Sequence, residues 1–166
     1  MDSIDTSKQL KASKRFRQRV VICGSMSFYG DMLAAKSHLQ REGIPAIVPE
    51  AEDGRIQDLD EDAFTEFKRR ASLQYLRVIR APETVAILAV NRDKHGIRDY
   101  IGPNTFAEIA VAFAQHKRVF LLQGIPDMYF EELRAWGVSL DGDLSEIGRY
   151  YSQAVNDRQP WLFEDL

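Results

Sequence analysis

The chain has 166 residues, of which 45% are hydrophobic, and its formal net charge is -3 at pH 7. This length suits one domain with one core, the hydrophobic content excludes a disordered chain, and the charge gives no general attraction to nucleic acids or membranes. The single cysteine excludes an internal disulfide, and the absence of a membrane-length apolar run or a signal-peptide core predicts a cytoplasmic protein.

Residues 1–18 differ from the rest because basic side chains crowd there with few apolar ones. We expect a basic, flexible segment ahead of a single domain over residues 19–166. The alternative is an arm that contacts phosphates, as basic arms do in DNA-binding proteins. Asp2 and Asp5 dilute the charge and favour the first interpretation.

Strands and helices alternate along the predicted domain. In chain order, the expected strands span 19–25 including a closing glycine turn, 44–48, 84–90, 118–122 and 138–140, and the expected helices span 28–42, 60–80, 105–115, 126–136 and 143–155. The strand at 84–90 is unbroken in hydrophobicity, so we expect it to be central. The long helix at 60–80 has an apolar side that includes Phe64, Phe67 and Val78.

Continuous apolar strands that alternate with helices are typical of a parallel sheet covered on both faces. With right-handed crossovers this becomes a doubly wound α/β domain, Rossmann-like or flavodoxin-like, with about five strands. Such a fold hosts many activities, so function has to be inferred from the loops at the carboxyl ends of the strands. The loops after the first and third strands should lie close together.

The loop after the first strand joins a buried strand to a helix N-terminus, which suits an anion. Gly24 lets backbone approach a ligand, and Ser25 and Ser27 add hydroxyl groups. The simpler alternative is that Ser27 only caps the helix. The candidate substrate-binding residues here are Gly24, Ser25, Met26, Ser27 and Phe28.

A long polar connection, from Asn91 to Asn104, follows the third strand and leads to Thr105 and Glu108 at the next helix. Thr-x-x-Glu is a capping box, with Thr105 at the N-cap, so Glu108 either caps the helix or performs chemistry. The long loop and the location at the sheet edge favour chemistry. A carboxylate near a helix N-terminus is expected to stay ionised, as a nucleophile requires. Cys23 is expected to be a buried structural thiol, and no spacing predicts a metal or a cofactor.

The strand Val20 to Ser25, the stretch Gly102 to Glu108 and the following Ala112 to Leu122 resemble the nucleoside 2-deoxyribosyltransferase superfamily, including its 2'-deoxynucleoside 5'-monophosphate N-glycosidases. Asp93 to Ile97 and Tyr100 to Thr105 are similar to a less characterised branch. The resemblance covers roughly residues 19 to 125. It implies that Glu108 attacks the anomeric carbon of a nucleoside or nucleotide, and that the protein is a homodimer.

The chain departs from this family at one position. Family hydrolases carry an Asp on the helix before the third strand, and Tyr75 stands about where that Asp would fall. The leaving-group acid must then be Asp93, Asp99 or Tyr100, or the reaction differs. Asn91 and Asn104 would orient sugar hydroxyls, and Gly102 and Thr105 would line the substrate site.

We therefore expect an N-glycosidase or deoxyribosyltransferase that uses Glu108. One alternative is a non-catalytic nucleotide sensor on the same fold. Another is a phosphoribohydrolase of the cytokinin-activating type, whose Gly-x-x-Thr-x-x-Glu helix start resembles Gly102 to Glu108. A third is a protein–protein module in which Glu108 is only a cap.

Overall fold

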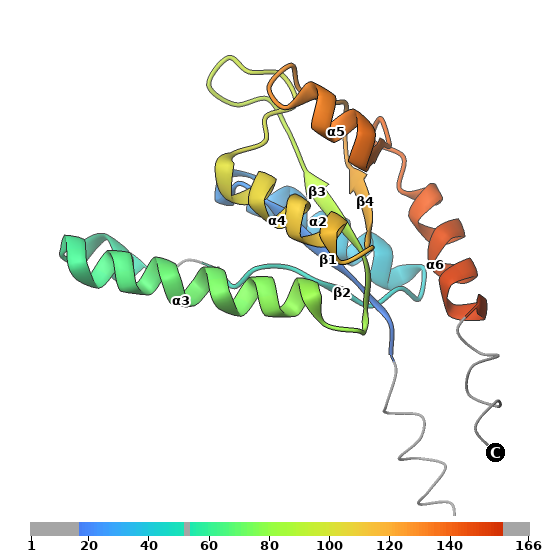
Figure 1. Ribbon diagram of the computed structural model, residues 1–166, viewed down its shortest axis with the longest axis horizontal. Helices are drawn as coiled ribbons and strands as arrows, with labels where there is room; N and C mark the ends of the chain where they lie inside the picture. Colours follow the sequence, from blue (N-terminus) through green and yellow to red (C-terminus); the bar gives the residue numbers. More distant parts are fainter. Residues whose placement is uncertain (1–16, 52–53, 158–166) are drawn as a thin grey trace, which may run out of the picture.

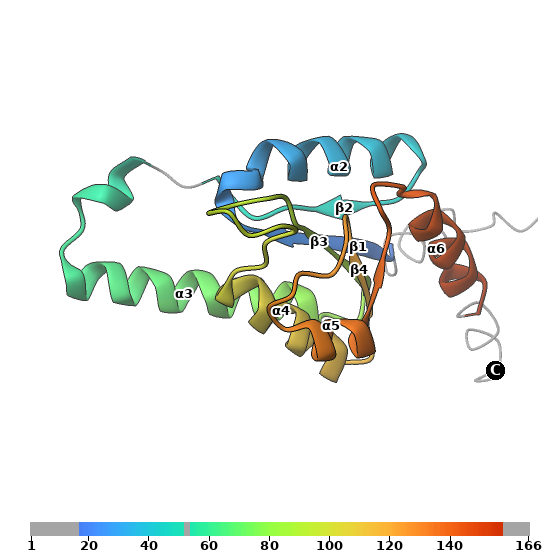
Figure 2. The same ribbon diagram turned by 90° about the horizontal axis from the view of Figure 1, so that it is seen from above.

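The computed structural model describes residues 17–51 and 54–157. Its centre is a five-stranded parallel sheet with the strand order β2-β1-β3-β4-β5, which is the flavodoxin-like order. Helices cover both faces, as Figures 1 and 2 show. The predicted doubly wound α/β fold is therefore confirmed, and the strand at 84–90 is central as expected.

Most predicted elements are present with small shifts at their ends. The strands are β1 (Arg19–Gly24), β2 (Ala46–Ile47), β3 (Thr84–Val90), β4 (Arg118–Leu121) and β5 (Gly137–Ser139), and the helices are η1 (Met26–Phe28), α2 (Tyr29–Arg41), η2 (Gly54–Asp58), α3 (Glu61–Arg80), α4 (Pro103–Ala114), α5 (Phe130–Trp136) and α6 (Ser145–Asp157). The sequence did not predict the short helix η2. The helix expected at 126–136 begins later, at Phe130, after a left-handed Tyr129.

Two hydrophobic clusters cover the two faces of the sheet. Alternate residues of β1 point to opposite sides: Val20 and Ile22 pack with α2 and α6, while Val21 and Cys23 pack with α3, α4 and α5. Every residue of β3 is buried. The sheet is thus covered on both faces, which explains the unbroken hydrophobicity of its central strand.

The carboxyl ends of β1 and β3 lie side by side, because Gly24 pairs with Val90 in the parallel register. Connections leave these two ends toward opposite faces of the sheet, which is the place where open α/β sheets bind ligands. The expected closeness of the loops after the first and third strands is confirmed. The ends of β1 and β3, the two best-buried strands, therefore form the base of any site at this edge.

Replacing Gly24 with alanine should lower the free energy of unfolding by about 2 kcal/mol. A Cβ atom on Gly24 would lie 2.8 Å from the carbonyl oxygen of Val90, so β1 and β3 would have to separate. Gly30→Ala in α2 is the matched control, because its Cβ would meet nothing within 4 Å. Urea denaturation measures both variants, and an equal effect of the two would contradict this account of Gly24.

The predicted basic segment falls on residues 1–16, outside the described residues, apart from Arg17 and Gln18. Gln18 is buried, and its carbonyl oxygen accepts a hydrogen bond from Tyr151 Oη at 2.9 Å. Within residues 17–51 and 54–157, no helix combines the length and apolar character needed to span a bilayer.

Candidate active site

A cavity of about 550 Å³ opens at the carboxyl end of β1, between α3 and the first turns of α4. Its volume falls in the range of roughly 300–1,000 Å³ that is typical of small-molecule sites. Gly24, at the end of β1, and Met26, at the start of η1, line it on one side, and Thr105 and Glu108 line it from α4. The cavity therefore joins two of the sequence motifs that were predicted to act together.

Glu108 does not cap its helix. The N-cap of α4 is Gly102, with Pro103 in the first turn, and no side chain caps this helix end. Proline's fixed φ suits the first helical position, so the helix begins two residues before Thr105. Thr105 is buried in the first turn, and Glu108 lies in the second turn, facing the cavity. The capping-box interpretation is therefore wrong.

Burial raises the pKa of Glu108 to about 7. The positive charge of Lys68 and a hydrogen bond from the Cys23 thiol lower this pKa, but they do not offset the loss of water around the carboxylate. The expectation that the helix N-terminus keeps Glu108 ionised is wrong, because the favourable field of a helix end fades beyond the first turn. A carboxyl group poised near neutral pH is characteristic of catalytic sites.

Two side chains from other elements lie against Glu108. Cys23 is buried at the end of β1, as predicted, and burial together with the nearby carboxylate raises the pKa of its thiol. Tyr75, on α3, lines the cavity and donates its hydroxyl hydrogen to the carbonyl oxygen of Ile22. Burial raises the pKa of Tyr75 strongly, so its hydroxyl stays protonated.

The sequence did not predict that Lys68 and Cys23 would contact this site. Lys68 follows Phe64 by one turn and precedes Tyr75 by two, so it is a charge placed on the apolar side of α3. A lysine on the apolar side of α3 was therefore the sequence signal that could have indicated a role for Lys68 at the site. The sequence pointed to Tyr75 only through the resemblance to the nucleoside 2-deoxyribosyltransferase superfamily, whose hydrolases carry an Asp at about this position.

The other residues of the β1 loop face in several directions. Ser25 Oγ accepts a hydrogen bond from Lys94 Nζ at 2.8 Å and lies 3.4 Å from Ser27 Oγ. Phe28 is buried and is itself the N-cap residue of α2, without a side-chain cap. The alternative in which Ser27 caps the helix is therefore wrong. Only Gly24 and Met26 of this loop line the cavity.

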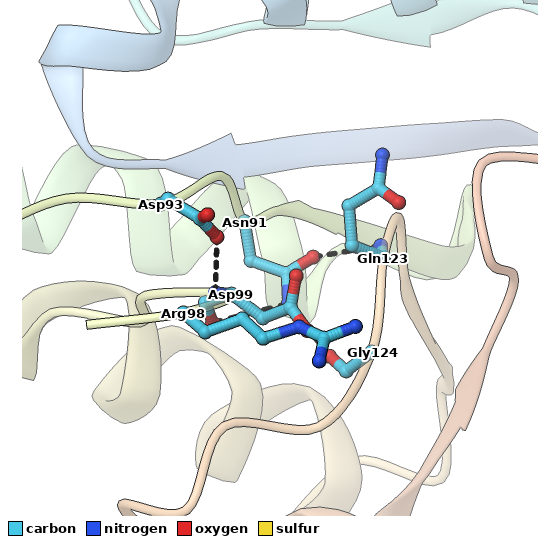
Figure 3. A network of polar contacts seen from close by, with 6 residues as sticks. All are labelled: Asn91, Asp93, Arg98, Asp99, Gln123 and Gly124. Carbon is cyan, nitrogen blue, oxygen red and sulfur yellow. Dashed lines mark hydrogen bonds and ion pairs between the residues drawn. The ribbon is translucent and has the colours of Figure 1, made fainter. Parts of the chain in front are cut away.

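Asn91 joins the ends of β3 and β4 (Figure 3), and it does not line the cavity. It is fully buried, and its Nδ2 donates to the carbonyl oxygens of Asp99 (3.2 Å) and Gly124 (2.8 Å). Its Oδ1 accepts from the backbone N–H of Gln123 at 2.9 Å. The amide thus uses both donor hydrogens within the protein.

The connection from β3 to α4 folds back on itself. Asp93 Oδ1 accepts from the backbone N–H of Asp99 at 2.9 Å, and the Asp99 carboxylate lies 3.7 Å from Arg98 Nε. Lys94 Nζ lies 5.5 Å from the centre of the Tyr100 ring. Among the described residues that line the cavity are Asn104 and Thr105, but not Asn91, Asp93, Asp99, Tyr100 or Gly102.

Within the described ranges, no three His, Cys, Asp or Glu side chains gather as metal ligands would. Comparisons with protein-family models, with curated proteins and with solved structures found no match. The chemistry of the cavity is therefore the basis for inferring what this protein does.

Proposed function

We propose that the protein cleaves the N-glycosidic bond of a nucleoside or nucleoside monophosphate, or transfers its deoxyribosyl group, with Glu108 as the nucleophile. One observation carries this proposal: Glu108 is a part-buried carboxylate with a pKa of about 7, inside a ligand-sized cavity at the carboxyl edge of the sheet. Glu108 does not cap its helix, so helix capping does not explain why a carboxylate occupies this position.

In this reaction the ionised carboxylate of Glu108 bonds to the anomeric carbon as the bond to the base nitrogen breaks. The base leaves with the bonding electron pair and takes up a proton. Water, or a second base in a transferase, then attacks the anomeric carbon and releases Glu108. Gly24 and Met26, from the β1 loop, and Asn104 line the cavity and would contact the sugar or its 5' substituent.

The sequence offers Asp93, Asp99 and Tyr100 as sources of the leaving-group proton. Each is held by contacts within the β3–α4 connection, so each would have to leave those contacts to reach the cavity. This mechanism therefore requires the connection to rearrange when substrate binds.

A non-catalytic nucleotide sensor is the second candidate, and one observation favours it. The Tyr75 hydroxyl, at the position where a related family has an acid, donates to the Ile22 carbonyl oxygen. Its proton is also held tightly, since burial raises the pKa of Tyr75. Such a site binds a nucleotide without helping the base to leave.

The decisive experiment incubates the protein with nucleosides, ribo- and deoxyribonucleoside monophosphates and NAD, and measures free base by chromatography. We expect base release that rises with pH to a plateau above a midpoint of about 7, because only ionised Glu108 attacks. Glu108→Gln should abolish release. Glu132→Gln, a change of an exposed glutamate on α5, should preserve it.

Absence of base release from every compound would refute the enzymatic proposal. If a nucleotide still raised the melting temperature, the sensor would be supported instead. Release that is unchanged in Glu108→Gln would show that the activity resides elsewhere.

A further inference from the structure

Helix α3 turns only the C-terminal part of its apolar side toward the core. Val78 packs against the core beneath the sheet, while Phe64 and Phe67 are 45% and 38% exposed. The prediction that this side faces the core is thus confirmed only for the C-terminal part. Phe67 and Lys68 line the cavity, on the wall opposite Glu108. The exposed part of the helix therefore presents an aromatic ring and a positive charge to the ligand of the cavity.

A base that leaves a sugar needs a proton, and the cavity wall offers few side chains that can supply one. Besides Glu108, the described lining residues with an ionisable side chain are Glu50, Lys68, Arg70 and Tyr75. Glu50 is an exposed carboxylate, which accepts hydrogen bonds. Arg70 Nε donates to Glu66 Oε1 at 2.9 Å, and a guanidinium does not give up its proton. Tyr75 donates to the backbone of β1 and keeps its proton, since burial raises its pKa, which leaves Lys68 as the donor.

The ammonium group of Lys68 acts on the site without being tied to a carboxylate. No ion pair joins it to another residue of the described ranges. Its charge nonetheless reaches Glu108 across the cavity and lowers the pKa of that carboxyl group. In a displacement at the anomeric carbon, the nucleophile and the departing base lie on opposite sides of the carbon. With Glu108 on the α4 wall, the base lies toward α3, beside Lys68.

Phe67 gives the α3 wall a surface for the base itself. Its ring is partly exposed and lines the cavity, and the residue directly precedes Lys68 in the helix. Nucleobases stack on aromatic side chains, because every base has a flat π-face. A base stacked on Phe67 lies within reach of the long side chain of Lys68, whose three ammonium hydrogens can point to a ring nitrogen or a carbonyl oxygen.

We propose that Phe67 and Lys68 bind the base of the substrate, and that Lys68 gives the base the proton with which it leaves. This inference rests on the proposed function. As the bond from the anomeric carbon to the base nitrogen breaks, its electron pair stays with the base, and an Nζ proton moves to a ring nitrogen. The neutral amine that remains takes a proton from the attacking water, whose oxygen bonds to the anomeric carbon as the bond to Glu108 breaks. No acid from the β3–α4 connection then has to enter the cavity.

Steady-state kinetics on the compound whose base is released fastest test the role of Lys68. We expect Lys68→Met to lower kcat about 100-fold or more, with little change in KM. Lys68→Arg should be as slow, because arginine keeps the charge but does not give up a proton. Phe67→Ala should instead raise KM, because it removes the stacking surface. Arg69→Met is the matched control and should leave kcat unchanged, since Arg69 is exposed on the same helix and does not line the cavity.

A change of leaving group separates proton donation from binding. In an N7-methylguanine nucleotide the base already carries a positive charge and departs as a neutral molecule, so it needs no proton. Lys68→Met should therefore release N7-methylguanine at close to the wild-type rate, whereas Glu108→Gln should release none. Equal losses on guanine and N7-methylguanine nucleotides, or a full rate in either Lys68 variant, would overturn proton transfer from Lys68 and leave Glu108 as the nucleophile. A wild-type protein that releases no base from any compound would overturn both this inference and the proposed function.

Discussion

Replacing Glu108 with glutamine should raise the free energy of unfolding by about 2 kcal/mol at a pH of about 8. In the folded protein burial raises the pKa of Glu108 to about 7, from an ordinary value of 4.5 in the unfolded chain. The folded state therefore binds more protons between these two values, and the wild-type protein loses stability as pH rises through that interval. Glutamine carries no charge and avoids the penalty.

The full pKa difference corresponds to roughly 3 kcal/mol, and partial exposure of the side chain reduces the expected gain. The gain should be almost absent below the ordinary pKa of glutamate, where both states are protonated. Urea titrations across this pH range, with Glu132→Gln as the exposed control, measure the effect. If Glu108 were a helix cap, the substitution would instead cost about 1 kcal/mol. A loss of that kind at every pH would refute the buried-carboxylate account.

Replacing Asn91 with alanine should lower the free energy of unfolding by about 3 kcal/mol. The substitution removes three hydrogen bonds from a fully buried side chain, and it leaves two carbonyl oxygens and the N–H of Gln123 without that partner. Because these bonds join the ends of β3 and β4 to the β3–α4 connection, that connection should also loosen.

Denaturation with urea measures the loss, and hydrogen exchange at the amide of Gln123 measures the loosening. Asn104→Ala is the control, since Asn104 is exposed and its replacement should change stability by less than about 0.5 kcal/mol. Equal effects at Asn91 and Asn104 would contradict a structural role for Asn91. If Asn91 instead contacts the sugar, as the sequence predicted, its loss should raise KM without changing stability.

Local sequence patterns predicted most of the strands and helices of the fold. The limits of β3 were predicted to the residue, because a buried parallel strand is apolar throughout and Pro82 and Asn91 bound the run. The start of α4 was predicted at Thr105 because Thr-x-x-Glu fits a capping box, but Pro103 begins the helix earlier. The N-cap is therefore Gly102, three residues before Thr105, and Glu108 lies in the second turn at the cavity wall instead of at a capping position.

The remainder of the site depends on contacts between distant segments. Glu108 could be predicted from its motif and its location at the sheet edge. The packing of α3 against α4 brings Tyr75 and Lys68 to the opposite wall of the cavity, and Cys23, on β1, donates a hydrogen bond to Glu108. No local sequence pattern encodes these contacts. Asn91 was predicted to face substrate because polar residues after a strand often do, whereas burial commits it to backbone groups.

The two walls of the cavity differ in how readily they open. The wall formed by the end of β1 belongs to strands that are buried along their length, and such segments open only when the whole domain unfolds. The wall formed by α3 is mostly exposed and has few buried apolar contacts, so it belongs to the part of the molecule that opens at low free energy. Ligand therefore meets one rigid surface and one pliable surface. Ordering α3 on binding costs free energy, and this cost lowers the affinity of the cavity for its ligand.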